Sequence, residues 1–163
     1  MVRSERGMTL LELLVVVGIL ATISALSIPD FVSWRKQAQY RLAAREMADV
    51  MRTARTRAIT RNLEQRVEIE VENCRYRLME GDRPTNSTDF DTVVTDWVDL
   101  PPEVALKKNL ACNSDADSKL QFNPNGSAQS GYVCIVEATS PDVCHFKVGV
   151  ASSTCGRVVV RTD

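Results

Sequence analysis

The stretch Gly7-Met8-Thr9-Leu10-Leu11-Glu12, followed by apolar residues as far as Ile28, decides how this chain is organised. The 21 residues from Met8 to Ile28 carry one charge, that of Glu12. At 1.5 Å per residue, a helix of this length is roughly 31 Å long, which matches the hydrocarbon core of a bilayer. We therefore predict a membrane-spanning helix over residues 8–28.

Three interpretations of this segment compete. A cleavable secretory signal would have a basic start, a shorter apolar region and a site of small residues, which Arg3, Arg6 and Ile23-Ser24-Ala25 loosely supply. A plain membrane anchor is the second. Neither explains Glu12, because an acidic side chain costs about 2.5–3.5 kcal/mol at the centre of a membrane helix and less near its end. The third interpretation gives Glu12 a partner, the α-amine that cleavage after Gly7 would create.

The run from Gly7 to Glu12 resembles the processing site of type IV pilins and type II secretion pseudopilins. In that family glycine precedes the cut and glutamate is the fifth residue after it. The resemblance implies that a prepilin peptidase cleaves between Gly7 and Met8, removing residues 1–7 as a leader, and that Met8 is N-methylated. The family usually has phenylalanine after the cut, where this chain has Met8.

A physical argument for Glu12 supports an assembly role. A carboxylate and a terminal ammonium are each expensive in lipid, but neighbouring subunits neutralise both when they pair them. The amine of Met8 and the carboxylate of Glu12 lie about one helical turn apart, so they could also meet within one chain. A head-to-tail contact between subunits does not close on itself and generates a filament.

The charge distribution divides the remaining chain into a basic stem and an acidic head. Residues 30–66 hold nine Lys and Arg against four Asp and Glu, whereas residues 67–163 hold nine against fifteen. Arg3 and Arg6 place the N-terminus in the cytoplasm, so the head is expected on the other side of the membrane, in an oxidising compartment. The resemblance implies that this membrane is the bacterial inner membrane, crossed once, and that the head lies in the periplasm.

Five cysteines, all in the head, suit such an oxidising compartment: Cys74, Cys112, Cys134, Cys144 and Cys155. They allow fifteen ways to form two disulfides and leave one thiol, and the sequence does not choose among them. No pair has C-x-x-C spacing and His145 is the sole histidine, so we predict neither a metal site nor a cofactor. His145 lies between Cys144 and Phe146 in an expected strand, where adjacent side chains point apart, so we predict no catalytic residue and no enzyme.

Apolar residues recur at helical spacing from Phe31 to Ile59, which predicts an amphipathic helix over residues 29–62. Pro29 is expected either to kink the helix or to begin a new segment at Asp30. The opposite face is basic, with Arg35, Lys36, Arg41, Arg45, Arg52, Arg55, Arg57 and Arg61. It is interpreted as a solvated face, or as a surface for the acidic head of a neighbour or for nucleic acid.

Beyond Asn62 the apolar period changes to two. Val67, Ile69 and Val71 alternate with charged residues, which is typical of a strand with one buried face. Further strands are expected near 76–78, 93–100, 104–107, 119–122, 132–138, 146–151 and 157–161. The predicted fold is α+β: a long N-terminal helix packed on a β-rich head over residues 63–163, built as an antiparallel sandwich.

Three segments of the head indicate which group of pilins and pseudopilins the chain resembles. They are Leu100-Pro101-Pro102-Glu103-Val104, then Phe122-Asn123-Pro124-Asn125-Gly126-Ser127-Ala128, and finally Gly156-Arg157-Val158-Val159-Val160. With the helix end Ala54–Asn62, they resemble the GspH/FimT/FimU group of minor pseudopilins and minor pilins. The resemblance implies a subunit that initiates or caps a type IV pilus or type II secretion pseudopilus, with other minor and major pilins or pseudopilins as partners.

An alternative is a FimT-like minor pilin that binds DNA during uptake. Such proteins carry a C-terminal Gly-Arg-x-Arg arrangement, whereas this chain has Gly156-Arg157 and reaches its next arginine at Arg161. On one strand face these arginines would lie roughly 13 Å apart and could each contact a phosphate. Since the head is acidic, nucleic acid is the less favoured partner.

Overall fold

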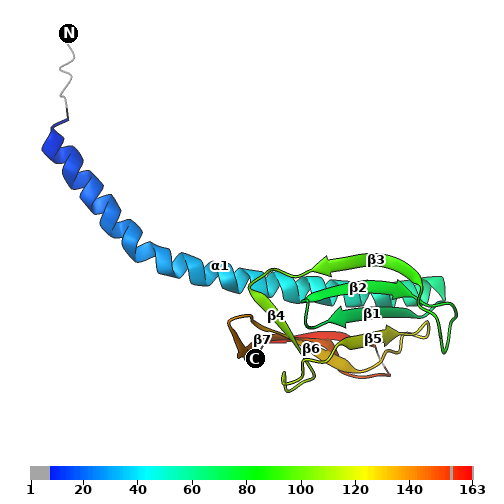
Figure 1. Cartoon of the computed structure of the whole chain (residues 1–163). Coiled ribbons are helices and arrows are strands. Elements are labelled where there is room, and N and C mark those ends of the chain that lie inside the picture. The colour runs from blue at the N-terminus through cyan, green and yellow to red at the C-terminus, as the bar shows by residue number, and fades with distance from the viewer. Residues whose placement is uncertain (1–7, 155, 163) are drawn as a thin grey trace, which may run out of the picture. The chain divides into compact units, whose positions relative to one another are not determined.

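The computed structural model describes residues 8–154 and 156–162, with the side chains of residues 25–30 outside the description. The described chain forms one helix, α1 (Leu10–Arg61), followed by eight strands (Figure 1). It divides into two compact units, Met1–Gln37 and Ala38–Asp163, which are described separately below.

The helix α1 is 52 residues long and passes through Pro29 without a break. The possibility that a new segment begins at Asp30 is therefore wrong. The helix ends where Asn62 adopts a positive φ of 55°, a left-handed conformation that asparagine tolerates better than most residues. This turn directs the chain into the first strand.

The strands form two four-stranded antiparallel sheets. The first sheet has the order β3-β2-β1-β5, and the second has the order β4-β6-β7-β8. The strands of the first sheet are β1 (Gln65–Glu70), β2 (Arg75–Glu80), β3 (Thr92–Asp99) and β5 (Ser118–Phe122). Those of the second are β4 (Val104–Lys108), β6 (Gly131–Glu137), β7 (Ser140–Val150) and β8 (Val158–Thr162).

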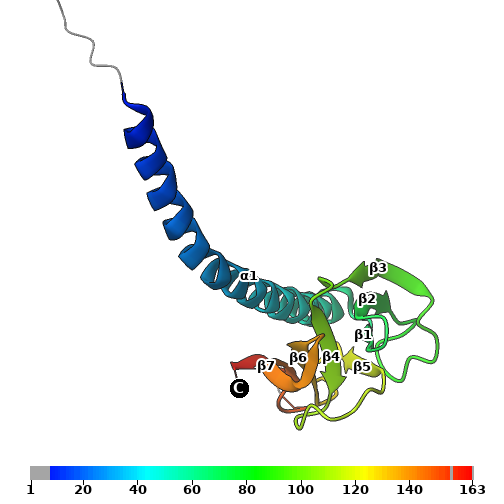
Figure 2. The same cartoon turned by 60° about the vertical axis from the view of Figure 1, so that its left-hand side comes forward.

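The core of the second unit lies between α1 and both sheets. Met47 and Met51 of α1 are fully buried with Val67 of the first sheet and Ile135 of the second. Figure 2 shows the strands of both sheets gathered around the C-terminal part of α1. The burial of β1 alternates as the period of two predicts, and the predicted α+β class is confirmed.

The seventh strand begins earlier than the sequence predicts. It starts at Ser140 rather than near residue 146, and it includes Pro141. Proline donates no hydrogen bond and therefore signals a loop. Strand β8 pairs only with residues 146–150 of β7. Pro141 therefore has no β8 residue beside it, and the missing N–H leaves no hydrogen bond unmade with that strand.

The buried residue Glu64, just after the end of α1, binds the loop between β2 and β3. The carboxylate of Glu64, which is 3% exposed, accepts hydrogen bonds from the backbone N–H groups of Asn86 (3.0 Å) and Ser87 (2.7 Å). The backbone of Glu64 also bonds to Gly81 and Arg83. A polar loop is thus held in one position by a charge-assisted contact.

A second buried carboxylate, Glu80 of β2, joins α1 to the first sheet. Its Oε2 accepts hydrogen bonds from Arg57 (3.2 Å) and from the fully buried Gln65 (3.0 Å). Arg61 lies 3.9 Å from the other carboxylate oxygen. Glu80 therefore neutralises the basic end of the helix where it meets the sheet.

Replacement of Glu80 by alanine is expected to lower the free energy of unfolding by about 2 kcal/mol. Removing one partner of a buried pair leaves the other charge and the Gln65 amide uncompensated, but Arg57 is partly exposed and is screened by water. Urea titration of the full-length protein in detergent measures the loss. Asp49→Ala, which breaks an exposed pair with Arg52, is the control and should cost less than about 1 kcal/mol. Equal losses in the two variants would contradict this role of Glu80.

Two of the sequence motifs in the head meet in space. A Cβ atom added to Gly156 would overlap the carbonyl oxygen of Gly126, and both glycines have positive φ. The N–H of Ala128 donates to the carbonyl of Ser153 (2.9 Å), which fastens the two segments together. Both glycines are therefore structural residues of one turn cluster.

Candidate functional site

The N-terminal end of α1 carries the residues of the predicted processing and assembly site. Met8 and Glu12 lie within the described chain and are exposed, whereas Gly7 lies outside it. Glu12 is in the first turn of the helix. Its negative charge there complements the positive end of the helix dipole and would complement an α-amine on Met8.

Thr9 is a site residue that the sequence reasoning missed. Its side-chain oxygen accepts a hydrogen bond from the N–H of Glu12 (3.2 Å), and its carbonyl accepts one from the N–H of Leu13 (3.2 Å). Thr9 is thus the N-cap of α1. The signal was present as Thr-x-x-Glu before an apolar run, the sequence pattern of a capping box. In that pattern the carboxylate of Glu12 is also expected to support the first turn of the helix.

Beyond Glu12 the helix is uncharged as far as Ser24 and has apolar residues on every side. From Leu10 to Ser24 every described side chain is exposed in the isolated chain, with Leu10 at 83%. A helix without a polar face is stable only when other apolar groups surround it. Among the residues that the structure describes, no helical stretch is both long and apolar enough to cross a membrane. The span over residues 8–28 includes residues whose side chains are not described, and it stays a prediction.

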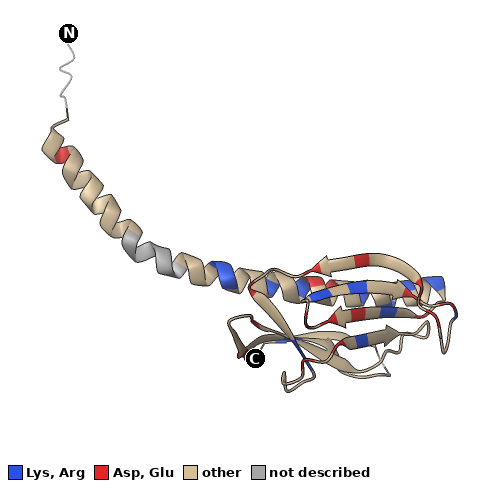
Figure 3. Cartoon of the chain, in the orientation of Figure 1, with Lys and Arg blue, Asp and Glu red and all other residues tan. Residues whose placement is uncertain are grey.

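Charged side chains are distributed differently in the rest of the chain (Figure 3). They gather on the later part of α1 and on the two sheets. On the first sheet, Glu68 pairs with Arg77 (2.6 Å) and Glu70 pairs with Arg75 (2.5 Å). The Arg75 guanidinium holds the pKa of the Glu70 carboxyl below its usual value. The guanidinium carbon of each arginine also lies 4.5 Å from the centre of the Trp97 ring on β3.

Arg157 and Arg161, the two arginines of the DNA-binding alternative, lie in different elements. Arg157 precedes β8, which begins at Val158, so the two arginines do not share a strand as predicted. Arg161 is in β8, and its guanidinium lies 5.6 Å from the centre of the Tyr132 ring. Both side chains are exposed. Contact with nucleic acid through them stays a prediction.

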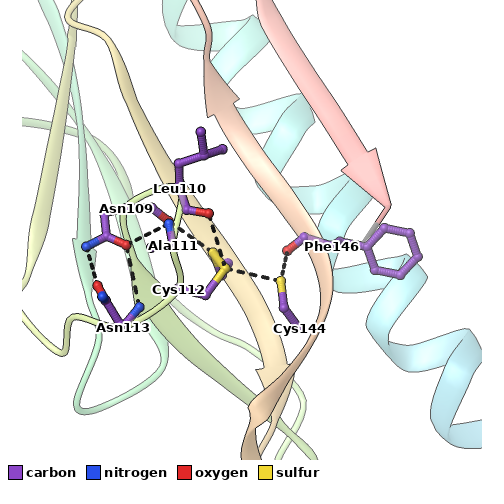
Figure 4. Close-up of a disulfide and its surroundings, with 8 residues drawn as sticks. Asn109, Leu110, Ala111, Cys112, Asn113, Cys144 and Phe146 are labelled. Carbon is purple, nitrogen blue, oxygen red and sulfur yellow. Dashed lines mark hydrogen bonds between the residues drawn. A yellow bond between two sulfur atoms is a disulfide. The ribbon is translucent and has the colours of Figure 1, made fainter.

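Three of the five cysteines lie together. Cys112, in the loop after β4, forms a disulfide with Cys134 of β6. Figure 4 shows the sulfur of Cys144, from β7, beside this bond, with its Sγ 3.2 Å from that of Cys112. Cys74 lies at the turn between β1 and β2, and Cys155 falls outside the described residues. The three sulfurs are within 4.8 Å of one another, a spacing that also suits metal ligands, but two of them are covalently joined.

The comparisons with known proteins agree with this architecture. Residues 43–160 match the family described as type II transport protein GspH, and residues 2–28 match the prokaryotic N-terminal methylation motif. No curated protein shows significant sequence similarity to the chain.

Several solved structures share the fold. The minor pseudopilin EpsH of the type 2 secretion system of Vibrio cholerae has a TM-score of 0.57 at 15% identity, covering 76% of this chain and 97% of that one. The type IV minor pilin FimU of Pseudomonas aeruginosa has a TM-score of 0.56 at 13% identity, covering 78% and 92%. E. coli GspH has a TM-score of 0.55 at 12% identity, covering 77% and 89%.

The likeness to these structures shows the fold, and the family match extends over most of the chain from the second half of α1 to β8. The methylation motif covers the segment that contains Gly7, Met8 and Glu12. The chain belongs to the GspH family of pilin-like proteins.

Proposed function

We propose that this protein is a minor pilin or pseudopilin that takes part in assembling a type IV pilus or a type II secretion pseudopilus. The observation that carries the proposal is Glu12, an acidic residue in the first turn of an exposed apolar helix and the fifth residue after Gly7, a glycine that suits cleavage. The GspH-type head and the methylation motif support the proposal.

In this proposal a prepilin peptidase cuts between Gly7 and Met8, and Met8 becomes the methylated N-terminus. Residues 8–28 hold the protein in the bacterial inner membrane with its head in the periplasm. Within the filament, the carboxylate of Glu12 pairs with the terminal amine of an adjoining subunit, and other minor and major pilins or pseudopilins surround the apolar helix. The protein works near the tip or in the initiation complex, as a structural subunit without enzymatic activity.

Because Thr9 caps the helix, Glu12 has two possible roles, in helix capping and in subunit pairing, and substitutions of Glu12 can distinguish them. Glutamine at N3 still supports a capping box, but it lacks the negative charge. A charge-pairing role therefore predicts that Glu12→Gln fails as Glu12→Ala does. A capping role predicts that glutamine restores function.

We expect both Glu12 variants to be cleaved normally and to reach sheared filaments at least about tenfold less than the wild-type protein. Loss of as little as 1.4 kcal/mol at the subunit contact gives this factor. Immunoblots of the filament and inner-membrane fractions measure the ratio. Thr9→Ala, which removes the cap at a cost of about 1 kcal/mol to the helix, is the control and should be incorporated. Normal incorporation of Glu12→Gln would rule out the pairing role.

A further inference from the structure

A groove in the head, here called the basic groove, is lined by residues of both sheets and has a volume of about 540 Å³. Its lining residues are Arg66 of β1, Lys119 and Gln121 of β5, Lys108 at the end of β4, and Asp117 and Gln129 from loops. Three cations thus converge from three strands, although acidic residues outnumber basic ones in the head. A cleft lined mainly by one sign of charge concentrates ions of the opposite sign.

Two of these cations, Arg66 and Lys108, are held in place by uncharged groups. The guanidinium of Arg66 donates a hydrogen bond to Gln121 Oε1 (3.3 Å), and its Cζ lies 3.5 Å from the centre of the Phe90 ring. The Nζ of Lys108 donates to the backbone carbonyl of Asp117 (2.9 Å). Among the described residues, neither cation forms an ion pair. Both can therefore make charge-assisted hydrogen bonds to a bound anion.

Two acidic residues limit the positive charge of the basic groove. The Nζ of Lys119 lies 3.6 Å from Glu68 Oε1, and Glu68 also pairs with Arg77. Asp117 lines the groove, where its Oδ1 accepts a hydrogen bond from the N–H of Val71 (3.0 Å). If Glu68 offsets Lys119 and Asp117 offsets one other cation, a single positive charge is left. A carboxylate matches this balance better than a phosphate monoester, which carries about −1.5 to −2.

The basic groove continues into a second hollow, here called the neutral hollow, of about 520 Å³. Gln121 and Gln129 line both, and the neutral hollow adds the polar side chains of Asn123, Ser127, Ser153 and Thr154. Amide and hydroxyl groups can both donate and accept hydrogen bonds, as the hydroxyl groups of a sugar do. Each volume lies within the range of roughly 300–1,000 Å³ that is usual for ligand sites.

We infer that the two hollows together bind a sugar chain that carries carboxylates. The carboxylate of one sugar unit lies between Arg66 and Lys108 in the basic groove. The hydroxyl groups of the adjoining unit bond to Gln129 and to the polar side chains of the neutral hollow. A nucleic acid fits less well, because its successive phosphates need a continued row of cations, and no lining residue of the neutral hollow is charged. Only the place where the head meets such a sugar, the periplasm, rests on the proposed function.

Isothermal titration of the full-length protein tests this inference, in a detergent without a sugar headgroup. The probe is trigalacturonate. Maltotriose has the same number of sugar units without carboxylates, and citrate has three carboxylates without a sugar ring. We expect trigalacturonate to bind at least about tenfold more tightly than either, because each lacks one set of hydrogen bonds. Raising NaCl from about 50 to about 300 mM should weaken the binding, since salt screens the exposed charges.

Lys108→Gln should weaken the binding of trigalacturonate about fivefold or more. Its matched control is Lys107→Gln, which removes the same charge from the adjacent residue. Adjacent strand residues point to opposite faces, and Lys107 pairs with Asp115 (2.5 Å), so this variant should bind as the wild-type protein does. Gln129→Ala should weaken the binding of trigalacturonate about threefold and leave that of citrate unchanged, because only the sugar reaches this amide.

Several results would overturn the inference. If maltotriose binds as tightly as trigalacturonate, the cations have no role; if citrate does, the site takes a simple anion. Tighter binding of a tetranucleotide, which also carries three negative charges, would assign the groove to nucleic acid. Absence of binding by every probe, or equal losses in the two lysine variants, also contradicts it. The probes are compared on wild-type protein, so a variant that fails to fold does not obscure the result. The filament assay of the Glu12 variants is independent of this measurement, so failure of one inference is distinguishable from failure of the other.

Discussion

Replacement of Gly7 by valine is expected to leave the protein at its full length and to abolish its incorporation into filaments. The β-branched side chain stiffens the backbone and occupies space at the residue that precedes the proposed cut. Without cleavage, the amine of Met8 stays in a peptide bond and cannot pair with a carboxylate of an adjoining subunit, and the charged residues of the leader stay attached to the apolar helix. On a denaturing gel the precursor band should persist, and mass spectrometry should find an uncleaved leader.

The control for this substitution is Gly18→Ala, which alters a glycine within α1. A Cβ atom at Gly18 meets nothing within 4 Å in the isolated chain, so processing should be normal. Complete maturation of Gly7→Val would place the cut elsewhere. An N-terminus beyond Glu12 in the wild-type protein would remove the basis of the proposed assembly mechanism.

The substitution with the largest expected effect on stability is Gly149→Ala. Gly149 pairs with Tyr132 across β6 and β7. An added Cβ atom would overlap the carbonyl oxygen of Gly131 and lie 2.7 Å from Cα of Tyr132. Both obstacles are backbone atoms in a paired strand, so relief requires β6 to move. We expect a loss of about 3 kcal/mol and a fall in Tm of roughly 10 °C, measured by calorimetry of the full-length protein in detergent.

Gly131→Ala tests whether backbone overlap is the cause. Gly131 lies in the same strand pair, but its Cβ atom would meet a methyl group of Leu120 at 2.7 Å, at the end of a flexible side chain. Rotation of Leu120 relieves this contact, and the expected loss is about 1 kcal/mol. If the two alanine variants had equal Tm values, the backbone contacts of Gly149 would not limit stability.

Local patterns in the sequence predicted most of the fold. The change of apolar period after Asn62 located the boundary between helix and strands, and alternation at Val67 and Ile69 identified the buried face of β1. Each of the eight strands lies at or near an expected position. The early start of β7 was missed because Pro141 is a loop signal when strand pairing is unknown. Which strands are neighbours in each sheet depends on contacts between distant residues, which periodicity does not contain.

The candidate site was predictable only where its residues are close in sequence. Gly7, Met8 and Glu12 form one short motif, whereas the disulfide joins Cys112 to Cys134 across 22 residues and was one of many possible pairings. The buried carboxylates of Glu64 and Glu80 were also missed. A charged residue normally indicates an exposed position, and only the surrounding N–H and guanidinium groups make burial favourable at these two sites.

Strand β3 forms one edge of the first sheet, and the features of this edge affect how neighbouring heads would interact in a filament. An unpaired strand edge can recruit a strand from a neighbouring molecule, and irregular pairing and charged side chains reduce that tendency. The pairing of β3 with β2 contains two register shifts, and Arg75 and Arg77 lie beside Trp97 of β3. In the proposed filament, heads at high local concentration are therefore expected to resist fusing into a continuous intermolecular sheet at this border.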